Sequence, residues 1–412
     1  MTTTINNKNK KPNVPNLRFP EFQGEWEKCK LGDKCDLLCG YAFDGKDIVE
    51  QGTYLLMRGI NITEGIIRHS SELDRYYTGS VNNLAKYKLT TGDLVIGMDG
   101  SKVGRNSAIV SLTENGSYLV QRVCRIKSCI GNDFILQLVN NHKFHKYVDM
   151  VKTSSAIPHI SLKDIQNFPI AVPLIQKEAD KISRLFHLLD ERIATQNKII
   201  DRLQTLIKGL NDSLYELYGN GITTSFAELG HSYSGLSGKT ANDFGTGKPF
   251  ITYLNVYSNN IVNENDYQYV RINEGEKQNV VKYGDVLFTL SSETPEEVGV
   301  GSVFLGKDEV YLNSFCFGIH IENEKQVYSP YLSYYVSSTP FRKFIYPFAQ
   351  GSTRFNLCKA DFEKASIKLP LLENQIHIYA ILNSIAEKIE TEEMMFEKYL
   401  IQKQYLLRQM FI

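Results

Sequence analysis

Residues 154–178 read SSAIPHISLKDIQNFPIAVPLIQKE, and residues 351–375 read GSTRFNLCKADFEKASIKLPLLENQ. The second stretch repeats the first, because a serine, an aspartate and a Pro-Leu pair recur at equivalent places. The equivalent residues are Ser155 and Ser352, Asp164 and Asp361, Pro173 and Pro370, and Leu174 and Leu371. In both copies, a long pattern typical of a helix follows the Pro-Leu pair. The chain is therefore predicted to contain two copies of one structural unit.

Three further blocks repeat in the same order. LTTGDLVIGM (89–98) matches VKYGDVLFTL (281–290), and each block is a polar Gly-Asp turn followed by a short apolar strand. Tyr118-Leu119 matches Tyr311-Leu312, and LDERI (189–193) matches IAEKI (385–389). The separation between equivalent residues stays between 192 and 197 positions throughout. Each copy is predicted to be a strand-rich globule, a Pro-Leu boundary and a long helix.

This organisation predicts an α+β fold with two tandem, strand-rich α/β globules, each followed by a long α-helix. A chain of 412 residues is long enough for each globule to bury its own core. The predicted segments are a disordered polar lead-in (1–16), a first globule (17–173), a first helix (174–218), a second globule (219–370) and a second helix (371–412).

The two predicted helices each carry a heptad seam, in which one face is apolar at alternating steps of four and three residues. Each seam is interrupted by a polar residue, Gln196 in the first helix and Glu392 in the second. A helix of about 40 residues is about 60 Å long, so it cannot hide inside one globule. The residues predicted to pair the helices are Leu189, Ile193, Gln196, Ile200, Leu203, Ile207, Ile378, Leu382, Ile385, Ile389, Glu392 and Phe396.

The seams also predict an antiparallel register with a pseudo-twofold axis between the two polar residues. In this register Gln196 faces Ile389 and Glu392 faces Ile193, and the two polar side chains hydrogen-bond across the axis. The outer layers would be apolar on both sides. They are Ile200 with Ile385, Leu203 with Leu382, Ile207 with Ile378, and Leu189 with Phe396.

Composition restricts the class of protein. The chain has 46 basic and 46 acidic residues, so any affinity for nucleic acid must come from local patches or from partners. No apolar run is long enough to span a bilayer, and the first 16 residues lack the apolar core of a secretory signal, which predicts a cytoplasmic protein. Among the seven cysteines, Cys35 and Cys39 have a spacing that could suit two zinc ligands, but no second Cys or His pair with such a spacing follows. Reduced thiols are therefore expected, and no metal site.

The whole pattern from about Leu17 onward resembles the DNA specificity subunit of type I restriction–modification systems. The opening LRFPEFQGEWEKCKLGD (17–33), with the single tryptophan Trp26, is similar to the start of such subunits. The resemblance implies that each globule is a target-recognition domain for one half of a bipartite DNA site. It also implies that the two helices pair antiparallel, set the gap between the halves and dock two methyltransferase subunits. Two further subunits would supply ATP-driven translocation and cleavage.

No catalytic site is expected in this chain. An adenine methyltransferase needs an Asn/Asp-Pro-Pro-Tyr/Phe loop, and the closest stretch is Ser329-Pro330-Tyr331. Ser237-Gly238-Lys239-Thr240 resembles part of a phosphate loop, but the first glycine of that motif is replaced by Tyr233. The resemblance implies that S-adenosylmethionine, ATP and Mg²⁺ bind to partner subunits, so no cofactor is expected here.

Candidate DNA contacts lie where basic and polar residues occur without acids. There is no Asp or Glu between Lys325 and Ala360, and FRKFIYPFAQGSTRFN (341–356) ends in a flexible, donor-rich stretch. Its counterpart in the first globule is 152–159, and DGSKVGR (99–105) and QRVCRIK (121–127) add further basic residues there. The candidates are Lys102, Arg105, Arg122, Arg125, Lys152, His159, Lys239, Arg342, Lys343, Arg354 and Asn356.

Two alternatives remain open from the sequence. A coiled-coil scaffold with two protein- or peptide-binding globules would share the repeat and the seams, but it would not need acid-free basic stretches. An enzyme built on the globules would need a catalytic constellation that the sequence does not display.

Overall fold

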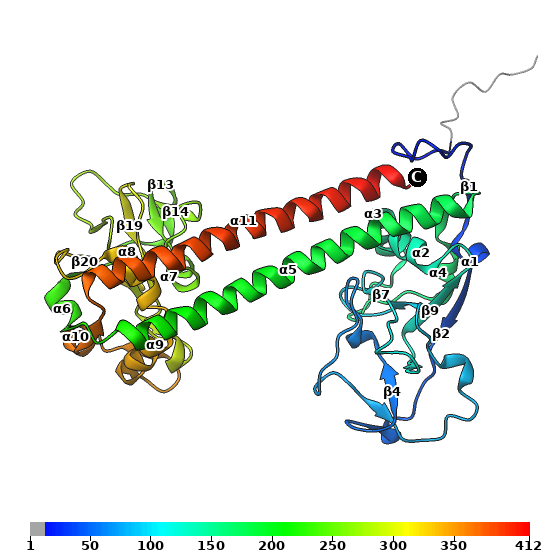
Figure 1. The fold of residues 1–412 in the computed structure, drawn as a ribbon, viewed down its shortest axis with the longest axis horizontal. Helices are drawn as coiled ribbons and strands as arrows, with labels where there is room; N and C mark the ends of the chain where they lie inside the picture. Colours follow the sequence, from blue (N-terminus) through cyan, green and yellow to red (C-terminus); the bar gives the residue numbers. More distant parts are fainter. Residues whose placement is uncertain (1–12) are drawn as a thin grey trace, which may run out of the picture. The chain divides into compact units, whose positions relative to one another are not determined.

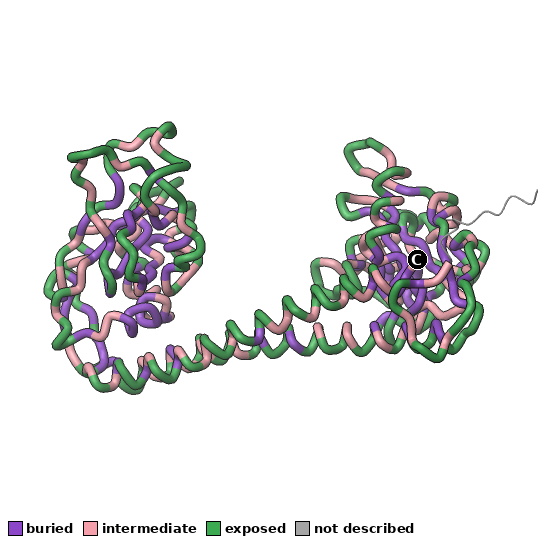
Figure 2. Tube along the Cα trace, turned by 90° about the horizontal axis from the view of Figure 1, so that it is seen from above, coloured by how far each residue is buried: buried purple, intermediate pink, exposed green. Residues whose placement is uncertain are grey.

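The computed structural model describes residues 13–412 and contains two compact units (Figure 1). Unit 1 comprises the chain up to Gln196 together with Met395–Ile412, and unit 2 comprises Asn197–Met394. Each unit therefore holds one globule and parts of both long helices, α5 (Gln176–Tyr218) and α11 (Leu372–Met410). Buried residues gather inside each globule, whereas the loop tips are exposed (Figure 2).

Unit 1 is built on two four-stranded sheets. The first has the antiparallel order β2 (Cys35–Cys39), β9 (Val123–Ser128), β6 (Leu94–Gly97) and β7 (Ser107–Ile109). The second has the order β3 (Ile48–Val49), β5 (Tyr76–Tyr77), β4 (Tyr54–Met57) and β8 (Tyr118–Leu119), in which β4 and β8 are parallel. The remaining elements are β1 (Glu27–Lys30), which pairs with β10 (Pro169–Val172), and the helices α1 (Leu31–Lys34), α2 (Asn132–Val139), α3 (His142–Val151) and α4 (Leu162–Asn167).

Unit 2 repeats this plan. Its first sheet has the order β12 (Gly230–Ser234), β20 (Cys316–Ile321), β16 (Val286–Thr289) and β18 (Gly301–Val303). Its second has the order β14 (Tyr267–Val270), β13 (Phe244–Ile251), β19 (Val310–Leu312) and β15 (Val280–Val281), with β13 and β19 parallel. The strand β11 (Ile222–Thr224) pairs with β23 (Ile367–Leu369). A small sheet has the order β17 (Ser291–Ser292), β22 (Phe355–Leu357) and β21 (Ala349–Gln350). The short α-helices of this unit are α6 (Phe226–Leu229), α7 (Tyr253–Ser258), α8 (Ser329–Tyr335), α9 (Thr339–Ile345) and α10 (Lys359–Lys364). The predicted α+β fold with two tandem globules and two long helices is thus confirmed.

The repeated Gly-Asp pair has a structural role. Gly92 and Gly284 have φ angles of +90° and +86°, which residues with a Cβ rarely adopt. The buried carboxylate that follows closes the turn, because Asp93 accepts a hydrogen bond from the Thr90 amide (2.9 Å) and Asp285 from the Lys282 amide (2.8 Å). Each turn thereby leads directly into a fully buried strand, β6 or β16.

Side chains of both long helices complete the core of each unit. In unit 1, Ile182 and Phe186 of α5 and Met410 of α11 belong to the same buried cluster as Trp26 and Phe134. In unit 2, Ile378 and Leu382 of α11 are buried in the core, and Ile207, Leu210 and Leu214 of α5 pack against it. The globules and the helices therefore fold as joint units rather than as separate domains.

The predicted seam residues are protected from solvent in both helices. The apolar pairing residues are buried or half-buried, and the two polar ones, Gln196 and Glu392, are 4% and 7% exposed. Glu392 forms an ion pair with Lys388, one turn earlier in α11. The hydrogen bond predicted between Gln196 and Glu392 stays a prediction.

The predicted register is wrong, although the antiparallel direction is confirmed within each unit. In unit 1, Asp190 forms an ion pair with Lys403, and Arg192 Nε donates to the Tyr399 hydroxyl (3.0 Å). The predicted axis places Asp190 opposite Met395, so its real partner lies about 12 Å further along α11 at 1.5 Å per residue. In unit 2, Gln204 Nε2 donates to Glu393 Oε1 (3.5 Å), which deviates in the same direction. The displacement is about one heptad in unit 1, eight residues at Asp190 and six at Arg192, and it is twelve residues at Gln204 in unit 2. The apolar seam residues of both helices nevertheless stay buried or half-buried.

The lead-in also differs from the expectation. Residues 1–12 of the predicted disordered segment lie outside the described residues. Residues 13–16 are placed, because the Asn13 carbonyl accepts a hydrogen bond from the Trp26 amide (2.7 Å) and Pro15 is buried. The globule of unit 1 therefore begins by residue 13.

We expect Asn141→Ala to lower the thermal unfolding midpoint of the protein. The buried Asn141 Nδ2 donates to the Leu407 carbonyl of α11 (2.8 Å), and its Oδ1 caps α3 by accepting from the Lys143 amide. Losing the cap and leaving a buried carbonyl unpaired should cost about 1–3 kcal/mol. The exposed helical Asn197→Ala is the control, and an equal midpoint for both variants would contradict this role.

Candidate nucleic-acid interface

Two of the segments predicted to contact DNA meet in unit 1. The loop 98–106, which follows β6, lies beside the segment 152–160, which precedes α4. The Gly100 amide donates to the Pro158 carbonyl (3.0 Å), and the Ile160 amide donates to the Met98 carbonyl (3.0 Å). Asp99 and His159 form a bridge between them. The predicted residues Lys102, Arg105, Lys152 and His159 therefore lie in two neighbouring loops.

The equivalent segments meet in unit 2. The loop 290–300, which follows β16, contains β17, and β17 pairs with β22 through Ser291 with Asn356 and Ser292 with Phe355. The Leu357 amide donates to the Leu290 carbonyl (2.8 Å). The predicted residues Arg354 and Asn356 lie at this pairing, and both are exposed. The same two loops are therefore paired in both units.

A third segment, which the sequence analysis missed, completes each site. In unit 1 this segment is the loop 59–68, which follows β4. In unit 2 it is α7 (Tyr253–Ser258), where the Tyr253 hydroxyl donates to the Ser291 carbonyl (2.8 Å). A pocket of 510 Å³ opens between the loops of unit 1; it is lined by Gly59, Ile60, Ile62, Thr63, Arg68, Asp99, Gly100, Ser101, Lys102 and Asn106. We call the three segments of each unit its three-loop cluster.

A weak repeat could have revealed the third segment. MRGINI (57–62) and ITYLNV (251–256) share only an asparagine and the apolar positions around it. Both asparagines are buried and close the loop that follows, Asn61 Nδ2 by donating to the Arg68 carbonyl and Asn255 Nδ2 by donating to the Asn263 carbonyl. The common feature is thus a buried amide, which a search for basic residues does not detect.

The predicted cations of the unit 1 cluster are paired but accessible. Lys102 Nζ lies 3.1 Å from Glu64, and Arg105 and Lys152 share the carboxylate of Asp149 at 2.6 and 2.7 Å. Their hydrogen bonds, from Lys152 first and Arg105 second, lower the pKa of Asp149. Lys102 is exposed, and the side chains of Arg105 and Lys152 are half-buried. Because ion pairs that solvent reaches contribute little, a phosphate group can compete for these cations. His159 Nδ1 lies 3.0 Å from the Thr153 hydroxyl, which holds the ring against its own segment, 152–160.

The two arginines of QRVCRIK differ in their surroundings. Arg122 is exposed, and its φ of +69° is the only positive value among the non-glycine residues that the structure describes, 13–412. Arg125 is buried in the central strand β9, where its guanidinium donates to the Lys86 carbonyl (3.0 Å) and to Asp36 (3.1 Å). The prediction that Arg125 contacts DNA is therefore corrected, because β9 is covered on both faces.

The structure also contradicts the prediction that Lys239 contacts DNA. Its side chain is 6% exposed, and its ammonium donates to the Arg271 carbonyl (2.6 Å) and pairs with Glu276. The hydrogen bond from Lys239 is the main cause that lowers the pKa of Glu276 to about 2. This lysine ties two turns of the second sheet together, so it is neither a phosphate-loop lysine nor a free DNA contact.

The structure likewise contradicts the prediction that Arg342 contacts DNA. Its guanidinium donates to the carbonyls of Glu296 (2.6 Å), Val298 (2.7 Å) and Gly299 (2.8 Å). Burial lowers the pKa of Arg342. The stretch 326–359, which contains no acid in the sequence, is thus approached in space by the acidic loop 293–297. Lys343 stays exposed next to it.

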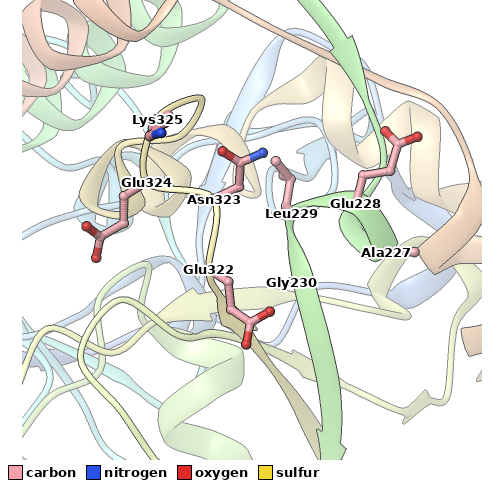
Figure 3. Close-up of a pocket in the computed structure, with 8 residues that line it drawn as sticks. All are labelled: Ala227, Glu228, Leu229, Gly230, Glu322, Asn323, Glu324 and Lys325. Carbon is pink, nitrogen blue, oxygen red and sulfur yellow. The ribbon is translucent and has the colours of Figure 1, made fainter.

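A further pocket lies at the other side of the unit 2 globule. It has a volume of 450 Å³ and is lined by Ala227, Glu228, Leu229, Gly230, Glu322, Asn323, Glu324 and Lys325 (Figure 3). Three carboxylates and one ammonium would repel a phosphodiester. This pocket is therefore a poor candidate for a nucleic-acid interface, and the three-loop clusters remain the candidates.

Within residues 13–412, no three His, Cys, Asp or Glu side chains are grouped so that they could hold a metal ion. No helix in this part of the chain is both long and apolar enough to cross a membrane.

We expect Arg342→Ala to destabilise the protein by about 1.5–3 kcal/mol, because three carbonyls lose a charged donor. The neighbouring exposed Lys343→Ala should change stability by less than about 0.5 kcal/mol. Thermal or denaturant unfolding of the two variants measures the difference. Equal stabilities would show that the carbonyls are satisfied without Arg342.

Comparisons with known proteins agree with this architecture. The E. coli type I restriction enzyme EcoAI specificity subunit is 30% identical over 186 residues, which are 43% of this chain and 30% of that protein. This match therefore spans about a third of the length of that relative.

Two solved structures share the fold. The type I restriction–modification S subunit from M. genitalium has a TM-score of 0.57 at 14% identity, with 97% of this chain and 99% of that chain covered. A structure described as concerning complex assembly and conformational transition of the type I R-M system has a TM-score of 0.56 at 16% identity, with 93% and 96% covered. The family model of the type I restriction modification DNA specificity domain matches residues 23–205 and 235–395, which are most of the sequence. The chain belongs to the type I restriction–modification DNA specificity family.

Proposed function

We propose that this chain is the DNA-recognition subunit of a type I restriction–modification complex. Each unit would read one half of a bipartite target with its three-loop cluster. The observation that carries this proposal is that the same three segments converge in both units while their side chains differ. A shared scaffold with different loop residues is what two readers of different half-sites require.

The chemistry of the loops suits reading of base edges. Sequence is read by side chains that reach the grooves, whereas phosphate contacts position the protein. The unit 1 cluster offers Lys102, Arg105 and Lys152, whose solvent-accessible ion pairs can open to phosphate. The unit 2 cluster offers Arg354 and Asn356, which are exposed at the paired strands β21 and β22. Amide and guanidinium groups are the donors that most often discriminate bases.

The long helices would connect the two readers and dock the methyltransferase subunits. α5 and α11 are continuous over 43 and 39 residues and pass from one unit into the other, so their length would set the gap between half-sites. Outside the seam, both helices keep large apolar side chains exposed. In unit 1 these include Leu188, Ile401 and Tyr405, and in unit 2 Leu206, Ile381 and Met394. Exposed apolar side chains on a helix are typical of a protein interface.

Methyl transfer would then belong to the partners. We propose that two methyltransferase subunits bind S-adenosylmethionine and that two restriction subunits use ATP and Mg²⁺. This chain would contribute recognition and spacing, without a catalytic group.

The two globules should be exchangeable. Replacing residues 30–173 with the first globule of a related subunit should change one half of the methylated motif and leave the other half unchanged. Adenine-methylation sequencing of a host that expresses the hybrid with its methyltransferase gives the readout. A hybrid that changes both halves, or neither, contradicts one reader per unit. A chain that gives no split motif at all would favour the coiled-coil scaffold instead.

Arg354→Ala should weaken specific DNA binding without changing stability. Arg354 is exposed, and no described residue (13–412) receives a hydrogen bond from its guanidinium, so its removal leaves the fold intact. If Arg354 reads a base, affinity for the cognate duplex should fall by about 1–3 kcal/mol. A phosphate contact would instead weaken all sequences alike and flatten the salt dependence. A lower melting temperature with unchanged affinity would show a structural role.

A further inference from the structure

One position next to the three-loop cluster differs in chemistry between the two units. In unit 1, the Met98 amide donates to the Arg122 carbonyl (2.9 Å), and the Met98 carbonyl accepts from the Ile160 amide of the segment 152–160 (3.0 Å). In unit 2, the Leu290 amide donates to the Phe315 carbonyl (2.9 Å), and Leu290 bonds Leu357. Arg122 and Phe315 therefore occupy equivalent positions, directly before the equivalent strands β9 and β20.

This position lies within reach of the same DNA segment as the loops. Met98 bonds both Arg122 and Ile160, and Leu290 bonds both Phe315 and Leu357. Arg122 and Phe315 are therefore each one bridging residue away from the segment that carries His159 or Asn356. Side chains at this position could contact base pairs next to those read by these two segments.

Neither side chain has an evident structural role. Arg122 is exposed, and within residues 13–412 its guanidinium has no hydrogen bond or ion pair. Its backbone is held at a φ of +69°, which glycine or asparagine would adopt at lower cost. Phe315 is 59% exposed, although its neighbours Cys316 and Phe317 are buried in the core. A strained arginine and an exposed phenylalanine at equivalent places are typical of a contact surface.

We propose that Arg122 and Phe315 are specificity-determining residues that read one base pair each, in opposite halves of the target. Arg122 reads a guanine through its O6 and N7 acceptors, and Phe315 contacts the methyl group of a thymine. The two half-sites thus differ at equivalent positions because the two side chains differ. This inference rests on the proposed function and extends it to individual base pairs.

The experiment uses the full chain in complex with its methyltransferase subunits and the duplex that carries its methylated motif. Arg122→Asn keeps a residue that tolerates a positive φ but cannot span a guanine edge. It should lose about 10- to 100-fold of its preference for guanine at one base pair of the half-site read by unit 1. Phe315→Ala should lose about fourfold of its preference for thymine at one base pair of the other half-site, the value of one buried methyl group.

Modified bases test the two contacts directly. Replacing the guanine by 7-deazaguanine should weaken wild-type binding but not binding by Arg122→Asn. Replacing the thymine by uracil should weaken wild-type binding about fourfold but not binding by Phe315→Ala. Phe315→Leu, which keeps an apolar side chain, should retain sensitivity to uracil.

Matched controls lie at the opposite ends of the same sheets. Tyr283 is 61% exposed in the turn before β16, and Lys88 is exposed before the turn that precedes β6. Tyr283→Ala and Lys88→Ala should leave base preference unchanged. The inference would be overturned if Arg122→Asn and Phe315→Ala had the same base preferences as the wild type. It would also be overturned if Phe315→Ala lost its association with the methyltransferase subunits while its base preference stayed unchanged. A wild-type complex that shows no sequence preference would instead overturn the proposed function.

Discussion

The structure depends on cores that are closed by side chains from both long helices. In unit 1, Phe186 of α5 and Phe411 at the end of α11 pack with Trp26 and Phe134, at ring distances of 5.3–6.3 Å. In unit 2, Ile378 and Leu382 are buried among the aromatic residues of the globule. Each globule buries its apolar surface together with residues from both long helices. This requirement places the first and last segments of the chain in one folding unit.

Because this packing stabilises the scaffold, the exposed side chains of the three-loop clusters can differ between the two units without loss of the fold. The helices and the Gly-Asp turns fix the strands, and the three-loop clusters are carried at the strand ends, where exposed residues do not support the core. Arg125, Lys239 and Arg342 show the limit of this freedom, because these cations are used to tie loops to the scaffold. Arg105, Lys152 and Arg354 remain at the surface. A rigid scaffold with variable loops allows one fold to serve two different half-sites.

Charge along the sequence was an incomplete guide to the site for a physical reason. The stretch from Lys325 to Ala360 has no acid of its own, yet the segment 293–299 approaches it, and three carbonyls of that segment bind Arg342. The third segment of each cluster was missed because its signature is a buried asparagine, Asn61 or Asn255, rather than a basic residue. Sequence neighbours reveal local composition, whereas the partner of a charged side chain is set by long-range strand pairing.

The sequence by itself determined the two-copy architecture, the helices and the faces by which they pair, because these follow from local periodicity. The register of the helices was decided only by the tertiary structure. A heptad seam repeats every seven residues, so a shift of one heptad again puts apolar residues opposite each other and leaves the pattern almost unchanged. What distinguishes the registers is the attachment of the helix ends, where Asn141 binds the Leu407 carbonyl and Asn211 binds the Tyr334 carbonyl. These contacts join residues more than a hundred positions apart, which local sequence patterns do not encode.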